Sequence, residues 1–201
     1  LATALDGVCW RGKGKKIRIM GNSQLAIPFM LGQYFNRSTH AMLFCSNNDG
    51  TVFTNEEQDW YAPLTGGNAD CLSTEDAVPA LPKDWKSDSV CLLLGRGYLI
   101  PDVQEYLAQH PELPSLLWVE NGTFNDNQEA MQYVADVVAL LLKIKKDAGV
   151  RTVYLFCGLP FILLPILSAN LHHVMNRVFF MEHGKDLQES SMSTRDMYSV
   201  C

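Results

Sequence analysis

The chain has 201 residues, of which 47% are hydrophobic and 19% are charged, and its formal net charge is −6. This length and composition are typical of a globular protein with a sizeable core, in one large domain or two small fused ones. The acidic balance argues against general binding to nucleic-acid duplexes, which requires a basic face, but it is compatible with a local site for a small anion.

In chain order, short apolar strands alternate with helices. The pattern predicts strands at Ile17–Met20, Ala41–Cys45, Thr51–Thr54, Val90–Leu94 and Leu116–Val119, helices from Pro101 through Gln109 and over Asn125–Lys146, and a short last segment at Arg195–Cys201. Residues 55–88 are the least regular stretch, and such a stretch within a compact chain is usually a binding loop or lid. The alternation predicts an α/β fold with mainly parallel sheets.

One part of this pattern occurs twice. Gly21 and Pro28 recur with the same spacing as Gly158 and Pro165, and each pair lies in a strand, glycine turn, apolar helix and second strand. This order is typical of a βαβ unit in a parallel sheet. We therefore expect two pseudo-symmetric Rossmann-like halves. The competing interpretation is a coincidence between two ordinary βαβ units.

The cysteines and apolar runs indicate the compartment. None of the six cysteines forms a CxxC pair, and Cys45, Cys91 and Cys157 fall in or at the end of apolar strand patterns, which is typical of reduced thiols in a cytoplasmic protein. No apolar run reaches the roughly eighteen residues that a membrane span needs. Because the chain begins at Leu1 rather than Met, we expect a domain excised from a larger effector protein, with any membrane anchor outside this fragment.

In open parallel sheets the ligand lies beyond the carboxyl ends of the strands, where helix N-termini present free N–H groups. The turns that meet this condition are Gly21–Gln24, Cys45–Asn48, Gly95–Tyr98, Asn121–Thr123, Gly158–Phe161 and Glu182–Lys185. Arg96 is the best-placed cation, because it sits between two glycines directly after a buried strand. Aromatic residues of the irregular stretch, such as Trp60, are candidates for stacking on a flat ligand, although burial on the core is an equal alternative.

Other functional motifs are weak. Gly95–Ile100 has part of the dinucleotide fingerprint but lacks its third glycine, and the sequence contains neither a P-loop nor a Gly-x-Ser-x-Gly elbow. His172 and His173 would point about 100° apart on a helix, so they are poorly placed to share a metal. The residues favour binding over catalysis, and we predict no catalytic residue, metal or cofactor.

The run RIMGNSQLAIPFMLGQYF, with the strand and Trp-bearing loop after it, resembles the N-terminal half of SAVED domains, and YLFCGLPFILLPILSANL resembles the C-terminal half. SAVED domains are sensors of bacterial cyclic-oligonucleotide anti-phage (CBASS) systems, built from two fused halves akin to the CARF fold of CRISPR-associated sensors. The resemblance covers nearly the whole chain and implies one domain over residues 1–201, with halves at about 1–88 and 89–201.

The resemblance implies a cyclic di-, tri- or tetranucleotide between the two halves, and a head-to-tail oligomer that activates a fused effector. It implies that the ligand is bound by Gly21, Asn22, Ser23, Gln24, Trp60, Gly95, Arg96, Gly97, Tyr98, Gly158, Leu159, Pro160 and Phe161. Cys45, Ser46 and Glu182 are further candidate ligand-binding residues because of their position in turns at the carboxyl ends of strands. Arg96 would contact a phosphate and an aromatic side chain a base. Two positions depart from the family pattern. Ala169 stands where the family has glycine, and the turn Leu159–Phe161 has no polar side chain, so recognition at that turn would come from backbone groups.

Two alternatives stay open. One is a ring-nuclease-like enzyme that cleaves a cyclic oligoadenylate through the ligand's own 2′-hydroxyl, with Ser23, Ser46 and Arg96 as the residues to suspect. The other is a generic nucleotide-binding α/β domain with structural partners, which predicts no preference for cyclic over linear nucleotides.

Overall fold

The computed structural model describes residues 16–20, 25–34, 42–46, 52–54, 66–72, 85, 87–122, 124–161, 163–171, 174–183 and 187–193. Its strands are β1 (Lys16–Met20), β2 (Met42–Ser46), β3 (Val52–Thr54), β4 (Ser89–Leu94), β5 (Leu116–Val119), β6 (Thr152–Cys157), β7 (Arg177–His183) and β8 (Leu187–Ser193). Its helices are α2 (Ala26–Tyr34), α3 (Ile100–Gln109), α4 (Asn127–Ala148) and α5 (Leu163–Leu171), with short 3₁₀ helices η2 (Ala69–Leu72) and η3 (Gly97–Leu99). The predicted segment at Arg195–Cys201 lies outside the described residues.

The described strands form two sheets. The larger sheet has the order β5-β4-β6-β7-β8, with parallel pairing from β5 through β7 and an antiparallel β8. In the smaller sheet β1 and β2 are parallel, and β3 returns antiparallel to β2 as the sequence predicts. The predicted α/β class with mainly parallel sheets is therefore confirmed.

The duplication is present in the structure. The order β1-α2-β2-β3 repeats as β6-α5-β7-β8 with the same parallel and antiparallel pairings. The register differs by one residue, since Lys16 pairs with Met42 whereas Val153, its counterpart in the second copy, pairs with Val178. The larger sheet adds β4 and β5, so the halves share one unit but differ in size.

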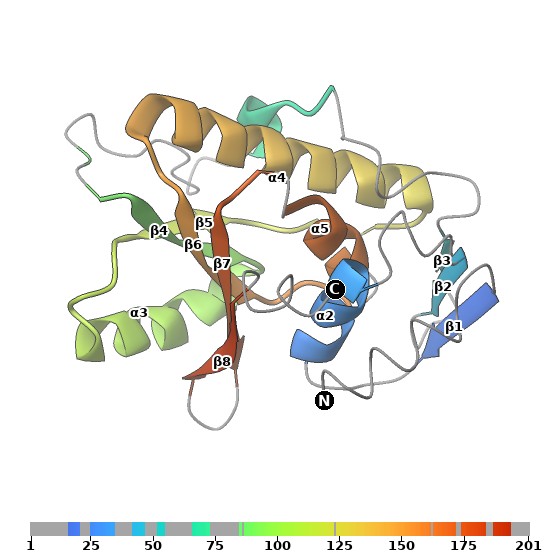
Figure 1. Ribbon diagram of the computed structural model, residues 1–201, viewed down its shortest axis with the longest axis horizontal. Coiled ribbons are helices and arrows are strands. Elements are labelled where there is room, and N and C mark those ends of the chain that lie inside the picture. Colours follow the sequence, from blue (N-terminus) through green and yellow to red (C-terminus); the bar gives the residue numbers. More distant parts are fainter. Residues whose placement is uncertain are drawn as a thin grey trace.

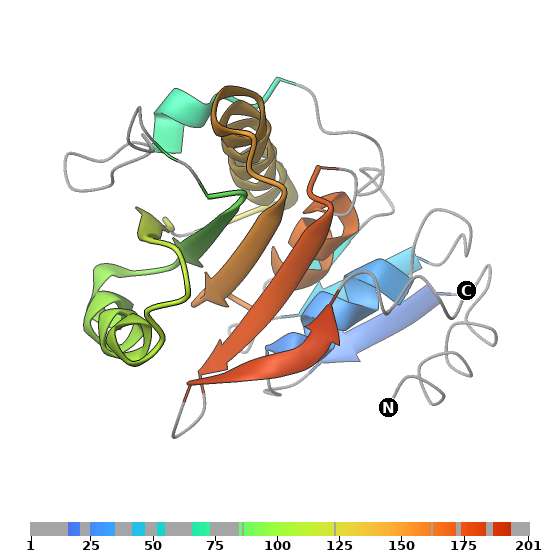
Figure 2. The ribbon, with the colours of Figure 1, turned by 60° about the vertical axis from the view of Figure 1, so that its left-hand side comes forward.

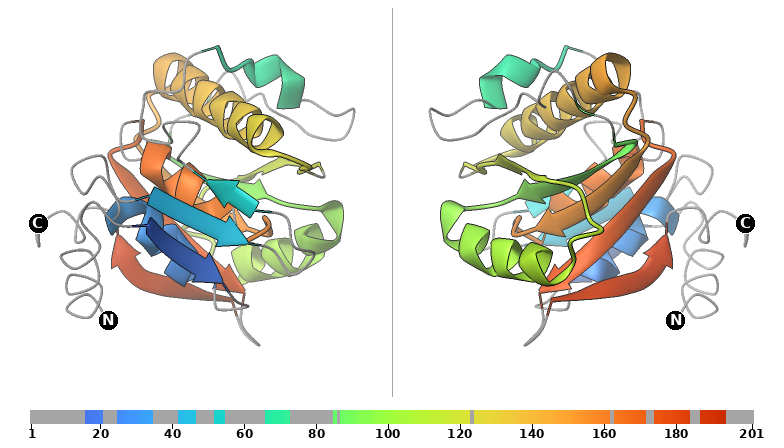
Figure 3. Two further views of the ribbon diagram at one scale, coloured as in Figure 1. Left: turned by 90° about the vertical axis from the view of Figure 1, so that its right-hand side faces the viewer. Right: turned by 90° about the vertical axis from the view of Figure 1, so that its left-hand side faces the viewer.

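The elements stack in layers. Helix α3 covers one face of the larger sheet, and α4 and α5 cover the opposite face (Figure 2). Helix α2 lies beside α5, and the small sheet lies beyond these two helices (Figures 1 and 3). The two helices of the repeat are therefore central, with one sheet on either side.

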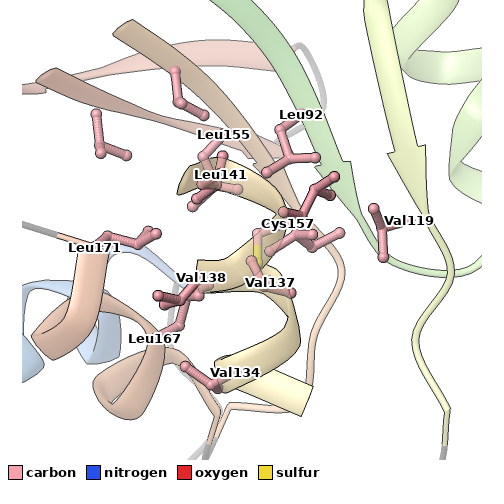
Figure 4. Packing of buried hydrophobic residues seen from close by; sticks show 14 of the residues in the cluster. Leu92, Val119, Val134, Val137, Val138, Leu141, Leu155, Cys157, Leu167 and Leu171 are labelled. Carbon is pink, nitrogen blue, oxygen red and sulfur yellow. The ribbon is translucent and has the colours of Figure 1, made fainter. Parts of the chain in front are cut away.

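The central strand β4 is an unbroken apolar run because both of its faces are covered. Leu92 and Leu94 face the α4 side, Cys91 and Leu93 face the α3 side, and all four side chains are at most 1% exposed. Figure 4 shows the core on the α4 side, which includes Leu92, Val119, Val134, Val137, Val138, Leu141, Leu155, Cys157, Leu167 and Leu171.

Helix α4 begins two residues later than predicted, because Asp126 is its N-cap. The Asp126 carboxylate accepts a hydrogen bond from the Glu129 N–H at 2.9 Å, and Glu129 Oε2 accepts one from the Asn125 N–H at 2.8 Å. This reciprocal arrangement satisfies N–H groups at the helix start. At the other end Gly149 has a φ of 73° and donates its N–H to the Lys145 carbonyl, so it ends the helix as predicted.

The two halves meet where α2 packs on α5. Pro28 lies in the first turn of α2, where its missing N–H costs nothing. The Phe29 ring lies 4.7 Å from the Phe180 ring of β7. A side chain at Gly32 would overlap the Pro165 carbonyl and the Ser168 hydroxyl of α5, so glycine is required for the close approach of the helices.

Candidate ligand-binding site

The strand order creates a crevice at the carboxyl ends of the central strands of the larger sheet. From β4 the chain passes through α3 to β5 on one side, and from β6 it passes through α5 to β7 on the other side. The connections leaving the carboxyl ends of β4 and β6 therefore diverge to opposite faces of the sheet (Figure 2). In open parallel sheets this switch point is where ligands bind.

The turn after β4 is held tightly. The Gly95 N–H donates to the Val119 carbonyl at 3.1 Å, and the Trp118 indole N–H donates to the Gly95 carbonyl at 2.9 Å. A side chain at Gly95 would come within 3.3 Å of the Gly158 backbone, and Gly158 donates its N–H to the Leu94 carbonyl at 2.8 Å. Glycine at both positions lets the ends of β4 and β6 lie close together.

Arg96 and Tyr98 follow on the surface of this turn. Arg96 is extended, with φ −77° and ψ 151°, its side chain is exposed, and its carbonyl accepts the Leu99 N–H at 3.0 Å. Tyr98 is 71% exposed, a large value for an aromatic side chain. The turn therefore presents one cation and one aromatic ring to solvent beside the crevice.

A pocket of about 310 Å³ opens beside this turn. It is lined by Leu25, Leu93, Tyr98, Leu99, Val103, Phe156, Cys157, Gly158, Leu159 and Met181. Leu25 directly precedes α2 and so belongs to the first copy of the repeat, whereas the other lining residues come from β4, β6, β7 and the segments that follow β4 and β6. The pocket therefore lies between the two halves, and none of its lining residues carries a formal charge.

The turn after β6 contributes backbone more than side chains. Gly158 and Leu159 line the pocket, while the Pro160 and Phe161 carbonyls accept N–H groups of the first turn of α5. Phe161 packs against the large core cluster. The apolar character of this turn, evident in the sequence, thus reflects its contact with the core.

Three of the predicted ligand-binding residues, Tyr98, Gly158 and Leu159, line the pocket, and Gly95 lies next to Gly158, with no room for a side chain between them. Arg96 and Gly97 lie in the same turn. Cys45 and Ser46 end β2, and Glu182 lies near the end of β7, each described by its backbone only. Gly21, Asn22, Ser23, Gln24 and Trp60 lie outside the described residues.

The sequence did not identify the apolar strand residues that line the pocket, nor the side chain that bonds to the turn after β4. Leu93 and Phe156 are the penultimate residues of β4 and β6, and Met181 of β7 lies beside Phe156 in the parallel register. Their shared face follows from strand alternation, but only after the order of the strands is known. Trp118, which bonds to Gly95, carries no motif that could have identified it.

Buried groups near the pocket are held neutral. Burial raises the pKa of the Cys157 thiol to about 12, although a hydrogen bond from the Leu159 N–H acts in the opposite direction. Burial also raises the pKa of the Tyr133 hydroxyl, and a repulsive interaction with Cys157 adds to this shift. Cys157 therefore lacks the thiolate character of a nucleophile at neutral pH.

Metal-binding and membrane-spanning features were sought within the same described residues. They contain no group of three or more His, Cys, Asp or Glu side chains that could hold a metal ion. Within them, too, no helix has both the length and the apolar character needed to cross a membrane.

Comparisons with known proteins support a fold assignment. No family model and no curated protein matches the sequence. The structure resembles the Acinetobacter baumannii Cap4 SAVED/CARF-domain containing receptor with the cyclic trinucleotide 2′3′3′-cAAA, at a TM-score of 0.67 and 14% identity, over 94% of this chain and 40% of that chain. The same receptor with 3′3′3′-cAAA gives a TM-score of 0.66 at 15% identity, over 94% and 41%.

A receptor of the same description from Moraxella osloensis matches with a TM-score of 0.61 and 15% identity, over 94% of this chain and 39% of that chain. The chain thus has the fold of SAVED/CARF-domain receptors, and the resemblance seen in the sequence is confirmed at the level of the fold. The chain spans about two fifths of the length of these receptors.

Proposed function

We propose that this chain is a sensor domain that binds a cyclic oligonucleotide in the pocket at the carboxyl ends of β4 and β6. The observation that carries this proposal is the position of the pocket: it lies at the switch point of the sheet and takes Leu25 from the other half of the duplication. Proteins of the same fold have been solved with cyclic trinucleotides.

The chemistry of the site suggests which residues contact the base of the ligand and which contact its phosphate. The uncharged, apolar lining suits a nucleobase, and the exposed Tyr98 ring offers a stacking surface at its edge. Arg96 lies in the Gly95–Gly97 turn beside the pocket, where its guanidinium can form two hydrogen bonds to a phosphodiester group. One local cation is enough for this role, so the net charge of −6 does not oppose it.

We further propose that ligand binding causes head-to-tail self-association of this domain and thereby activates a fused effector in anti-phage defence. The support for this step is the family resemblance in both copies of the repeat. Sedimentation velocity with and without the cyclic ligand tests it, because self-association raises the sedimentation coefficient only when the ligand is present.

The binding proposal is tested by calorimetric titration of the 201-residue chain with cyclic di-, tri- and tetranucleotides and with their linear counterparts. We expect submicromolar binding of one cyclic species, weakened about tenfold to a hundredfold in Arg96→Ala, since charge-assisted hydrogen bonds contribute about 1.5–3 kcal/mol. Arg151→Ala is the matched control, because Arg151 is an exposed arginine at the amino end of β6. Absence of binding across the panel would refute the sensor function.

The same samples distinguish a sensor from a ring nuclease. Chromatography of the ligand after prolonged incubation should return the intact cyclic species. Linear products would favour the enzyme, and equal affinity for cyclic and linear species would favour the generic nucleotide-binding domain.

A further inference from the structure

Trp118 makes two contacts with the turn that carries Arg96. Its indole N–H donates to the Gly95 carbonyl at 2.9 Å, and its ring lies beneath Gly97, where an added Cβ would come within 3.3 Å of the ring atom Cζ2. Trp118 comes from β5, in register with Leu93 of β4. A side chain of the neighbouring strand thus contacts the turn at the glycines on both sides of Arg96.

These contacts restrain the main chain of the turn. The N–H of Gly95 is bound to Val119 and its carbonyl to Trp118, so both hydrogen-bonding groups of the first glycine are occupied. The Trp118 ring blocks movement of the second glycine toward the sheet. Because the glycines on both sides of Arg96 allow more main-chain conformations than other residues do, these contacts compensate for the conformational freedom that the glycines introduce.

We propose that Trp118 is a positioning residue for ligand binding: its indole holds the Gly95–Gly97 turn so that Arg96 is directed toward a phosphate of the ligand. This role rests on the proposed function. Trp118 itself needs no contact with the ligand, since it acts through the turn.

The test is a thermodynamic cycle with Trp118→Phe and Arg96→Ala, measured by titration with the cyclic nucleotide that binds the wild type. Phenylalanine keeps an aromatic ring at this position, but it removes the N–H donor and the ring atoms Cζ2 and Cη2 that lie against Gly97, so both contacts are weakened. We expect Trp118→Phe to weaken binding about three- to tenfold, since loss of the hydrogen bond alone gives a change of this size. In the Arg96→Ala background the same change should have little further effect, because the residue that Trp118 positions is already missing.

Salt dependence gives a readout that a merely structural role would not move. An arginine–phosphate contact makes the affinity fall as salt rises, so the wild type should show a steeper dependence than Arg96→Ala. Trp118→Phe should show a dependence between those of the wild type and Arg96→Ala, because the arginine contact is weakened and not removed. Additive losses in the cycle, or a wild-type salt dependence in Trp118→Phe, would overturn the positioning role.

Trp85→Phe is the matched control. Trp85 packs against the core, and its indole nitrogen is buried with no hydrogen-bond partner, so this variant also loses one indole N–H. Its affinity and salt dependence should equal those of the wild type. If the wild type binds no member of the panel, the sensor function fails together with this role; if it binds and the cycle is additive, only the role of Trp118 fails.

Discussion

The side-chain amide of Asn127 pairs with the main chain of Thr54. The Thr54 N–H donates to Asn127 Oδ1 at 3.1 Å, and Asn127 Nδ2 donates to the Thr54 carbonyl at 3.1 Å. Asn127 begins α4 and Thr54 ends β3. The amide thus satisfies main-chain groups of β3 as a neighbouring strand would, and it connects the small sheet to the helix that covers the larger one.

We expect Asn127→Ala to lower the free energy of unfolding by about 1–2 kcal/mol, because two partly buried hydrogen bonds are lost together. Denaturation in urea measures this change. Gln128→Ala is the control, since Gln128 is exposed at the next position of α4 and its replacement should change stability by less than about 0.5 kcal/mol. Equal stability of the two variants would show that the amide pairing contributes nothing to the fold.

Gly32→Ala tests the contact between the two halves. In an isolated helix this change stabilises by about 1 kcal/mol, but here the new methyl group would overlap the Pro165 carbonyl and the Ser168 hydroxyl. We expect a net loss of about 1–3 kcal/mol and a lower Tm in thermal unfolding. Gly122→Ala, at a position with open space around the added Cβ, should unfold at the wild-type temperature; a stable Gly32→Ala would contradict the close packing of α2 on α5.

Tyr98→Ala should weaken ligand binding about tenfold with no loss of stability, because the ring is mostly exposed and stacking on a base contributes about 1–3 kcal/mol. Tyr98→Phe keeps the stacking surface and should bind as the wild type does. Leu142→Ala removes another exposed apolar side chain, on α4, and serves as the control in the same titration. Wild-type affinity in Tyr98→Ala would exclude this ring from the site.

Because two cysteine thiols are buried, we expect the free energy of unfolding to fall at alkaline pH. Burial raises the pKa of both Cys91 and Cys157 from 9.0 to about 12, so above pH 9 the unfolded chain has released protons that the folded chain retains. Stability is therefore complete below pH 9 and declines as the pH rises, by about 1.4 kcal/mol per pH unit for each thiol.

Urea denaturation under reducing conditions at several pH values between 8 and 10 measures this slope. In Cys91→Ala the slope should be smaller by the contribution of one thiol, whatever the stability of the variant at neutral pH. An unchanged slope in Cys91→Ala would mean that this thiol ionises as readily in the folded chain as in the unfolded one.

Local patterns in the sequence determined the elements and the duplication. The apolar run Val90–Leu94 predicts a buried strand, and the structure buries every residue of it. The repeated glycine and proline predict two matching βαβ units, which the pairings of β1–β2 and β6–β7 confirm. These features depend on residues that are near one another in the chain, so periodicity and turn chemistry are sufficient to predict them.

Only the tertiary structure decided the order of the strands and the residues that meet. The placement of β4 between β5 and β6 creates the crevice, and it brings Leu25, Leu93 and Met181 to one pocket. The bond from Trp118 to Gly95 and the pairing of Asn127 with Thr54 likewise join residues far apart in the chain. Such contacts depend on the packing of layers, which fixes which faces meet and leaves no local signal in the residues involved.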